Sequence, residues 1–219
     1  MVSHTDDVKS SRFLCIIYIC RGNYGTDSGG ECAVPLVHRL HSPSNGNGLF
    51  WYSFEIGPCH IIFYSTEHDF LPNSTQYAWL ENDLNSVSRT LTPWLIVGSH
   101  RPMYSSLAGT DSIKEKLQQY VEPLLYQYQV DLHIFGHIHS YERTCKVYQN
   151  QCVDNGTTQV LMGMGGQQLT QGTYTPVNWS IYHDIAFGYT HMQVNKTHLS
   201  FFYHHSSDDA IYDQFVLSK

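Results

Sequence analysis

Three histidines stand where predicted buried strands end, and their imidazoles could bind metal ions. "PWLIVGSH" ends in His100, and "DLHIFGHIHS" carries His137 and His139 two positions apart. Because the carboxyl ends of parallel strands share one edge of an open α/β sheet, we expect the three imidazoles to converge there. A further strand, "RFLCIIYIC", leads into "CRGN" and places the amide of Asn23 at the same edge as an additional ligand.

The alternative is that these histidines have no chemical role. The chain contains 14 histidines, so a single H-x-H pair is a weak signal by itself. His100 and His137 could then be core imidazoles that are satisfied by hydrogen bonds. Two neighbouring strands that both end in histidine favour the metal-binding interpretation.

Hydrophobic periodicity predicts the elements that must position these residues. The runs "WLIVG" and "LHIFG" are predicted strands with a helix between them. Together they make a βαβ unit with parallel strands around residues 94–135. That helix is expected to open at Asp111, and Pro123 should kink or shorten it. Gly48–Phe54 and His60–Ser65 predict a hairpin, and the apolar spacing after Ser74 predicts another helix with Ser74 as its cap.

The last third of the chain changes to a hairpin pattern. Four strand-like runs follow Cys152, and "NKT" makes a tight connection between two of them; the runs are "TQVLMGMGG", "FGYTHMQV", "HLSFFYHH" and "IYDQFVLS". No internal repeat or low-complexity segment interrupts the chain. The fold class is therefore predicted to be α/β, with mixed sheets in a single unit.

Composition limits the possible partners. A chain of 219 residues suits one domain, and 16 Tyr with 10 Phe favour many half-buried strand positions. The formal net charge of −7 argues against a nucleic-acid partner, because no basic stripe is present to contact phosphates. The apolar run Phe13–Cys20 is too short to span a membrane and lacks the features of a signal peptide. The sequence does not indicate an oligomeric state.

Cysteines and glycosylation sequons favour an oxidising compartment. Cys145 and Cys152 bracket a short loop and could close a local disulfide. Four N-x-[ST] sequons predict glycosylation in a secreted, extracellular or lysosomal protein, although this chain shows no signal peptide; they are Asn73, Asn155, Asn178 and Asn195.

Several blocks of the chain resemble the purple acid phosphatases, which are calcineurin-like metallophosphoesterases. "VGSHRPMYSS" and "GHIHSYERTC" are similar to the last two signature blocks of that family, and the likeness extends over residues 21–219. The resemblance implies two stacked mixed sheets flanked by helices, with residues 21–219 as the C-terminal part of the catalytic domain and residues 1–20 as an atypical segment ending in a strand.

The same resemblance implies a phosphatase that uses an Fe(III) ion paired with Zn, Mn or Fe(II) to hydrolyse a small phosphorylated substrate. Asn23, His100 and His137 would bind the divalent ion, and His139 the ferric ion. Two such ions clamp a phosphate ester between them.

Two departures from the family pattern predict impaired activity. The family's remaining ligands come from G-D-x-G and G-D-x-x-Y blocks, and this sequence contains no Gly-Asp dipeptide. Tyr24 occupies the place of the catalytic histidine in the family's G-N-H block, and a phenol with an ordinary pKa of about 10 is a poor acid–base group at acidic pH. We therefore expect at most one weakly bound divalent ion. The alternative is a non-catalytic truncated relative or a metal-binding protein.

Residues beside the histidines are assigned supporting roles. Arg101 and Tyr104 are expected to fix the loop after His100, with contact to substrate as the minority interpretation for Arg101. Glu142 and Arg143 are expected to pair with each other or with neighbours, as outer support for the ligands. Two further groups are interpreted as non-functional: Glu67–Phe70 as a structural turn, and His204, His205, Asp208 and Asp209 as solvated residues at a hairpin tip.

Overall fold

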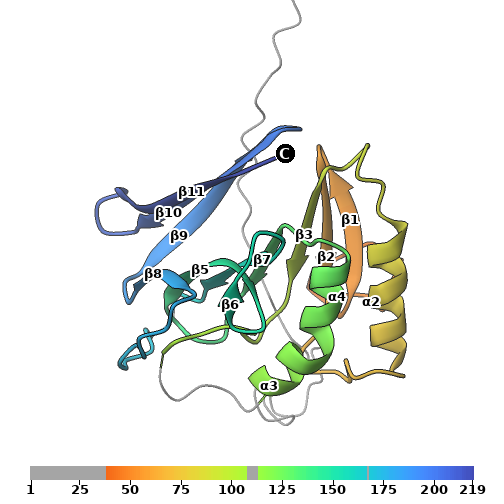
Figure 1. Ribbon diagram of the computed structural model, residues 1–219, viewed down its shortest axis with the longest axis horizontal. Helices are drawn as coiled ribbons and strands as arrows, with labels where there is room; N and C mark the ends of the chain where they lie inside the picture. Colours follow the sequence, from red (N-terminus) through yellow and green to blue (C-terminus); the bar gives the residue numbers. More distant parts are fainter. Residues whose placement is uncertain (1–37, 108–112, 167) are drawn as a thin grey trace, which may run out of the picture.

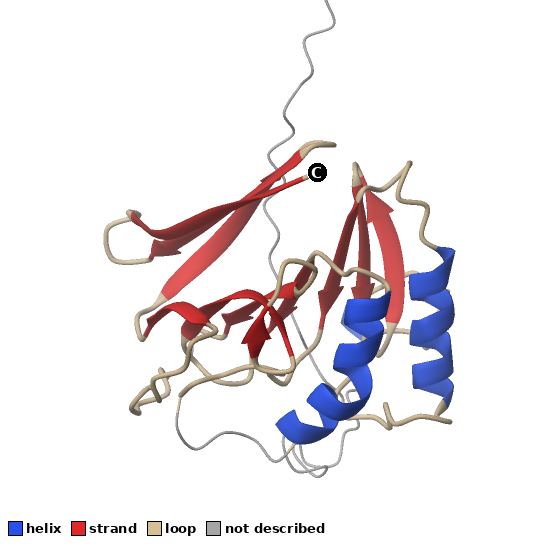
Figure 2. Cartoon of the chain, viewed as in Figure 1, coloured by secondary structure: helices blue, strands red, loops and turns tan. Residues whose placement is uncertain are grey.

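A computed structural model describes residues 38–107, 113–166 and 168–219. Its strands form a larger mixed sheet and a smaller antiparallel one, with helices beside the larger sheet (Figure 1). Figure 2 shows the helices confined to one side of the molecule and the three-stranded sheet on the other. The predicted strand at Phe13–Cys20, the loop with Asn23, and Asp111 lie outside the described residues.

The larger sheet has the strand order β1-β2-β3-β4-β7-β5-β6, and β8 pairs with β5. Strands β2, β3, β4 and β7 run parallel, whereas β1, β5, β6 and β8 pair antiparallel with their neighbours. The bounds are β1 Tyr52–Ile56, β2 Cys59–Phe63, β3 Trp94–Gly98, β4 Leu132–Phe135, β5 Tyr141–Tyr148, β6 Gln151–Cys152, β7 Thr157–Met162 and β8 Ser180–Asp184.

The predicted βαβ unit and the predicted hairpin are confirmed. β3 and β4 pair in parallel, with Gly98 opposite Ile134. β1 and β2 form the hairpin around Gly57, whose φ of 55° suits a glycine in a tight turn. The strand-like run "TQVLMGMGG" forms β7, which pairs antiparallel with β5 as the hairpin pattern predicts, but it also has a parallel neighbour in β4, which the pattern did not indicate. β7 is inserted between β4 and β5 and runs parallel to β4, because its apolar side chains are buried on both faces of the central sheet.

Helix α2, Thr75–Ser86, begins as the sequence predicts. The Ser74 hydroxyl accepts a hydrogen bond from the backbone N–H of Tyr77 at 3.1 Å. Leu80 and Leu84 are buried on its inner face.

The second helical segment is built from α3 (Lys114–Lys116), a π-helical turn η2 (Leu117–Val121) and α4 (Glu122–Gln127). The π-turn ends two residues before Pro123, which has no N–H to donate into a regular α-helical ladder. The predicted interruption at Pro123 therefore takes the form of one wide turn. It leaves Glu122 buried, at 3% exposure.

Two hydrophobic cores lie on opposite faces of the larger sheet. The smaller sheet consists of β9 (Gly188–Val194), β10 (His198–His205) and β11 (Ile211–Ser218), in the order β11-β10-β9. Along β3, Leu95 and Val97 pack with the helices, while Trp94 and Ile96 pack with the smaller sheet. This alternation follows from the two-residue period of a strand. Both faces of the central parallel strands are thus covered.

Candidate metal-binding edge

His100 and His137 meet at the carboxyl edge of β3 and β4. Each follows its strand by two residues, and the backbone N–H of Gly136 donates to the carbonyl oxygen of His100 at 2.9 Å. His137 has a φ of 70°, in the left-handed region that is uncommon for residues other than glycine. Such strained backbone is concentrated at functional sites, because the surrounding structure must hold it in place.

The two imidazoles are close enough to share one cation. Nδ1 of His137 lies 3.1 Å from Nε2 of His100, and the ring planes are inclined by 70°. Two nitrogens bound to one divalent ion at about 2.1 Å, with an angle of about 90–110° between them, would lie about 3.0–3.4 Å apart. The observed separation fits this requirement.

His139 is held separately, by the segment that follows β7. Its Nδ1 lies 2.5 Å from the carbonyl oxygen of Gln168, and its backbone N–H donates to the Thr170 hydroxyl at 2.9 Å. The contact with Gln168 assigns the proton to Nδ1 and leaves the lone pair on Nε2, as is usual for a histidine that binds metal. A side chain at Gly163 would meet the Ile138 carbonyl oxygen at 1.8 Å, so glycine is required where this segment passes the histidine loop.

The structure thus brings together two of the three imidazoles. Within residues 38–107, 113–166 and 168–219, no three His, Cys, Asp or Glu side chains are grouped closely enough to hold one metal ion. His139 is held by Gln168 and Thr170, and its place beside the other two imidazoles at a common edge stays a prediction.

A buried polar chain that the sequence analysis missed lies under His100. Nε2 of His133 is 3.0 Å from the Ser99 hydroxyl, and its Nδ1 is 2.7 Å from Oε1 of Gln159. Burial lowers the pKa of His133 to about 4, so the ring is neutral at neutral pH. The signal in the sequence was a histidine inside the apolar strand "DLHIF", where a buried ring needs hydrogen-bond partners.

Arg101 is bound by a carboxylate rather than left free for substrate. Its Nε lies 2.6 Å from Oε1 of Glu67 and its Nη2 lies 3.1 Å from Oε2, in a bidentate ion pair. Its backbone N–H donates to the Thr66 hydroxyl at 3.1 Å. The turn at Glu67–Phe70 is therefore structural, as predicted, and it fixes the residue next to His100.

Tyr104 is buried within the fold. It is 1% exposed, its hydroxyl donates to Glu122, and its ring packs edge-on against Trp179 with 5.1 Å between centroids. This agrees with the expectation that Tyr104 fixes the loop after His100. A position on an open substrate rim is excluded by its burial.

Glu142 and Arg143 do not pair with each other, because adjacent residues of a strand point to opposite faces. Glu142 accepts hydrogen bonds from Ser106 and Ser180, on the helix side of the sheet. Arg143 forms a bidentate ion pair with Asp213 of β11, at 2.7 and 2.9 Å. Both therefore bind neighbours, and Arg143 joins the two sheets.

The histidines near the tip of the β10–β11 hairpin are not solvated as expected. His204 is 9% exposed, and its ring stacks on Tyr189 and contacts His191 at a tilt of 31°. Nε2 of His205 contacts the carboxylate of Asp184. Sequence spacing did not reveal this, because the ring neighbours come from β9 and β8. Asp208 and Asp209 are exposed, in agreement with the expectation.

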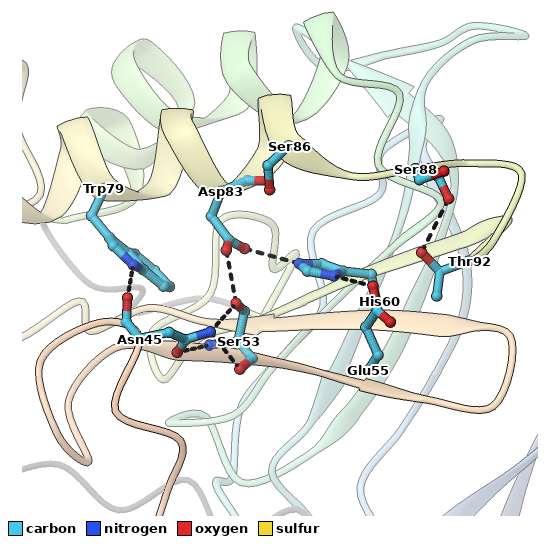
Figure 3. A network of polar contacts seen from close by, with 9 residues as sticks. All are labelled: Asn45, Ser53, Glu55, His60, Trp79, Asp83, Ser86, Ser88 and Thr92. Carbon is cyan, nitrogen blue, oxygen red and sulfur yellow. Dashed lines mark hydrogen bonds and ion pairs between the residues drawn. The ribbon is translucent and has the colours of Figure 1, made fainter.

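A Ser–Asp–His group beside helix α2 is structural (Figure 3). The Ser53 hydroxyl donates to Asp83 at 2.8 Å, and Nε2 of His60 lies 2.9 Å from the other carboxylate oxygen of Asp83. An activated serine would instead donate its proton to the histidine. Ser53 is also 2% exposed, so this cluster serves to fasten the β1–β2 hairpin to α2.

Cys145 and Cys152 form a disulfide, with 5.7 Å between their Cα atoms. It closes the β5–β6 hairpin. All four sequon asparagines, Asn73, Asn155, Asn178 and Asn195, are exposed. Among the described residues, no helix has the length and apolar character needed to cross a membrane.

Comparison with known proteins identifies the family. The profile of the calcineurin-like phosphoesterases matches residues 9–141, and that of the iron/zinc purple acid phosphatase-like protein C matches residues 156–214. A nucleotide pyrophosphatase/phosphodiesterase of Hordeum vulgare is 37% identical over 209 residues, which cover 88% of this chain and 57% of the barley protein.

Two further similar proteins are purple acid phosphatases by name. A probable inactive purple acid phosphatase of Arabidopsis thaliana is 36% identical over 89% of this chain and 34% of its own length. The structure of the purple acid phosphatase from yellow lupin (Lupinus luteus) seeds superposes with a TM-score of 0.82 at 34% identity, covering 92% of this chain and 38% of the lupin chain. The chain thus spans between about a third and three fifths of these relatives. It has the calcineurin-like metallophosphoesterase fold and belongs to the purple acid phosphatase family.

Proposed function

We propose that this chain binds one divalent cation weakly through His100 and His137, and that it hydrolyses phosphomonoesters poorly or not at all. The observation that carries the proposal is the 3.1 Å separation of the two facing ring nitrogens at the carboxyl edge of the sheet. Asn23 would complete this ligand set, and His139 would serve the ferric position.

The proposed roles follow from the chemistry of these groups. A bound divalent ion supplies Lewis-acid polarisation of a phosphoryl oxygen and lowers the pKa of bound water. The chain's own contribution is to orient His100 and His137 and to keep a lone pair on Nε2 of His139. By resemblance to the family's blocks, this chain lacks the Gly-Asp dipeptides that would supply carboxylates for a second ion, and Tyr24 stands at the place of the acid–base histidine. These two departures support weak or absent catalysis.

The direct test combines metal binding with turnover. Purified protein is titrated with Zn²⁺ by calorimetry, and p-nitrophenyl phosphate hydrolysis is followed at mildly acidic pH with added Fe and Zn. We expect no more than one Zn²⁺ bound per chain and negligible hydrolysis of the ester. His137→Ala should abolish Zn²⁺ binding. His198→Ala, at an exposed histidine outside this edge, is the matched control. Two tightly bound metals with a purple absorption band would refute the proposal.

A parallel assay addresses the substrate class. The barley relative is a nucleotide pyrophosphatase/phosphodiesterase, so a dinucleotide pyrophosphate is offered beside the monoester. Cleavage of the pyrophosphate that His137→Ala removes would favour an active enzyme of that class over the impaired phosphatase proposed here.

We also propose that the protein passes through a secretory compartment and carries N-linked glycans. The disulfide and the exposure of the four sequon asparagines support this. A mobility shift after treatment with an N-glycosidase tests it. Replacing all four asparagines with glutamine should abolish that shift.

A further inference from the structure

The loop after His100 is fixed at two points by buried carboxylates. This loop, residues 101–107, is largely inaccessible: Met103 is 0%, Tyr104 1% and Leu107 1% exposed. Glu142 reaches it from β5 and Glu122 reaches it from α4. Within the described part of the chain, the hydrogen bonds of both glutamates go to this loop and its neighbours, so we assign their effect on His100 to the loop.

Glu142 connects the two histidine-bearing loops. It follows His139 by three residues, at the start of β5. Its Oε2 accepts the backbone N–H of Ser106 at 2.8 Å, and its Oε1 accepts the hydroxyls of Ser106 and, at 2.6 Å, of Ser180. The chain that carries His137 and His139 is thereby joined to the chain that carries His100.

Glu122 provides the second attachment. The π-turn before Pro123 leaves Glu122 buried beneath the loop, where it accepts the Tyr104 hydroxyl and, at 3.2 Å, the backbone N–H of Gln149. The backbone N–H of Asn150 in turn donates to the Tyr104 hydroxyl at 3.0 Å. Single-turn π-segments are frequent at functional sites.

Both carboxylates are buried at a cost that their contacts must offset. Glu142 is 1% and Glu122 is 3% exposed. Neither forms an ion pair with another residue in the described ranges; the Lys114 ammonium interacts with Glu142 only as a more distant charge. Removing a carboxylate from water without a paired cation is expensive, so well-packed apolar residues would be the more stable choice.

We propose that Glu122 and Glu142 are positioning residues, which hold the loop after His100 so that His100 and His137 face one another at the separation a cation requires. This inference rests on the proposed cation site, because it assigns the groups that set that site's geometry. It adds Glu122, which the sequence did not indicate, and it gives Glu142 a defined partner in Ser106.

The test uses Glu142→Gln and Glu122→Leu in the full chain. A glutamine keeps the size but offers one acceptor oxygen, whereas Glu142 receives three donors. Both donors to Glu122 reach the same oxygen, so leucine is used there to remove the acceptor altogether. We expect each variant to bind Zn²⁺ at least about tenfold more weakly by calorimetry, the usual effect of losing an outer partner of a metal ligand. Glu115→Gln, at an exposed position on α3, is the matched control and should bind as the parent does.

Hydrogen exchange separates this inference from the proposed function. In cation-free protein, amides of residues 99–107 should exchange faster in both variants than in Glu115→Gln. If the parent chain binds no Zn²⁺ but exchange rises, the proposed function fails and the positioning role stands. If Zn²⁺ affinity and exchange are both unchanged, the positioning role is overturned.

A milder variant covers the case in which Glu142→Gln does not fold. Ser106→Ala removes one donor to Glu142 and leaves the backbone contact in place. It should weaken Zn²⁺ binding in the same direction by a smaller factor. A purely structural role would lower the melting temperature of Ser106→Ala and leave its Zn²⁺ affinity unchanged, which would contradict the inference.

Discussion

At the scale of single residues, the environment of each histidine decides its chemistry. His137 faces His100 from a strained backbone position, His139 is tied to a carbonyl oxygen, and His133 is fully buried. His60, by contrast, lies beside a carboxylate. The same side chain is therefore a candidate ligand in one place and a structural group in another.

The buried ring of His133 predicts a loss of stability in acid. Its pKa in the folded state is lowered to about 4, whereas an unfolded histidine titrates near about 6.5. The unfolded state therefore binds a proton first as pH falls, and the free energy of unfolding should decrease between these two values. The full effect is about 3 kcal/mol.

Urea unfolding measured across that pH range tests this. His133→Gln, which cannot titrate, should show a flatter pH dependence than the parent. His198→Gln, at an exposed position on β10, should retain the parent's slope. An unchanged slope in His133→Gln would contradict the prediction.

At the scale of elements, the β5–β6 hairpin shows how a local constraint reaches the candidate site. The disulfide closes it, and the two residues at its tip, Gln149 and Asn150, both have positive φ. Their backbone N–H groups bind Glu122 and Tyr104. The hairpin is thus connected, through Glu122 and Tyr104, to the loop after His100.

Removing this disulfide should destabilise the protein. Cys145→Ala with Cys152→Ala frees a loop with a sequence separation of 7, and the chain-entropy estimate for such a loop is about 2.5 kcal/mol. Urea unfolding of the oxidised parent and the double variant measures the difference. A reductant should lower the stability of the parent and have a smaller effect on the double variant. Equal free energies of unfolding would show that the hydrogen bonds at the tip hold the β5–β6 hairpin without the disulfide.

At the scale of the whole molecule, the two sheets are joined by a largely buried ion pair as well as by apolar packing. The carboxylate of Asp213 in β11 accepts hydrogen bonds from the guanidinium of Arg143 and the hydroxyl of Tyr141, which both lie on β5. The side chains of Arg143 and Asp213 are 16% and 6% exposed. Their contact crosses between the layers seen in Figure 1.

Breaking that pair should loosen the smaller sheet. Asp213→Asn leaves the Arg143 guanidinium without its carboxylate, which costs about 3 kcal/mol for a buried pair. Hydrogen exchange of β9–β11 should rise and the melting temperature should fall. Asp154→Asn, at an exposed position in the turn before β7, is the control and should change neither. Unchanged exchange in Asp213→Asn would mean that apolar packing alone holds the layers together.

The sequence by itself determined the local elements and the residues at their ends. The Ser74 cap, the βαβ unit, the interruption at Pro123 and the positions of His100 and His137 after their strands all follow from short-range patterns. These features depend on neighbours within a few residues, which periodicity and capping rules report directly.

Only the tertiary structure decided which side chains meet. The insertion of β7 between β4 and β5, the separate attachment of His139, the burial of His204 and the contacts of Glu122 and Glu142 involve partners from other elements. Hydrogen bonding and ring packing between distant segments depend on how the layers assemble. The spacing of residues along the sequence does not report which distant segments come into contact.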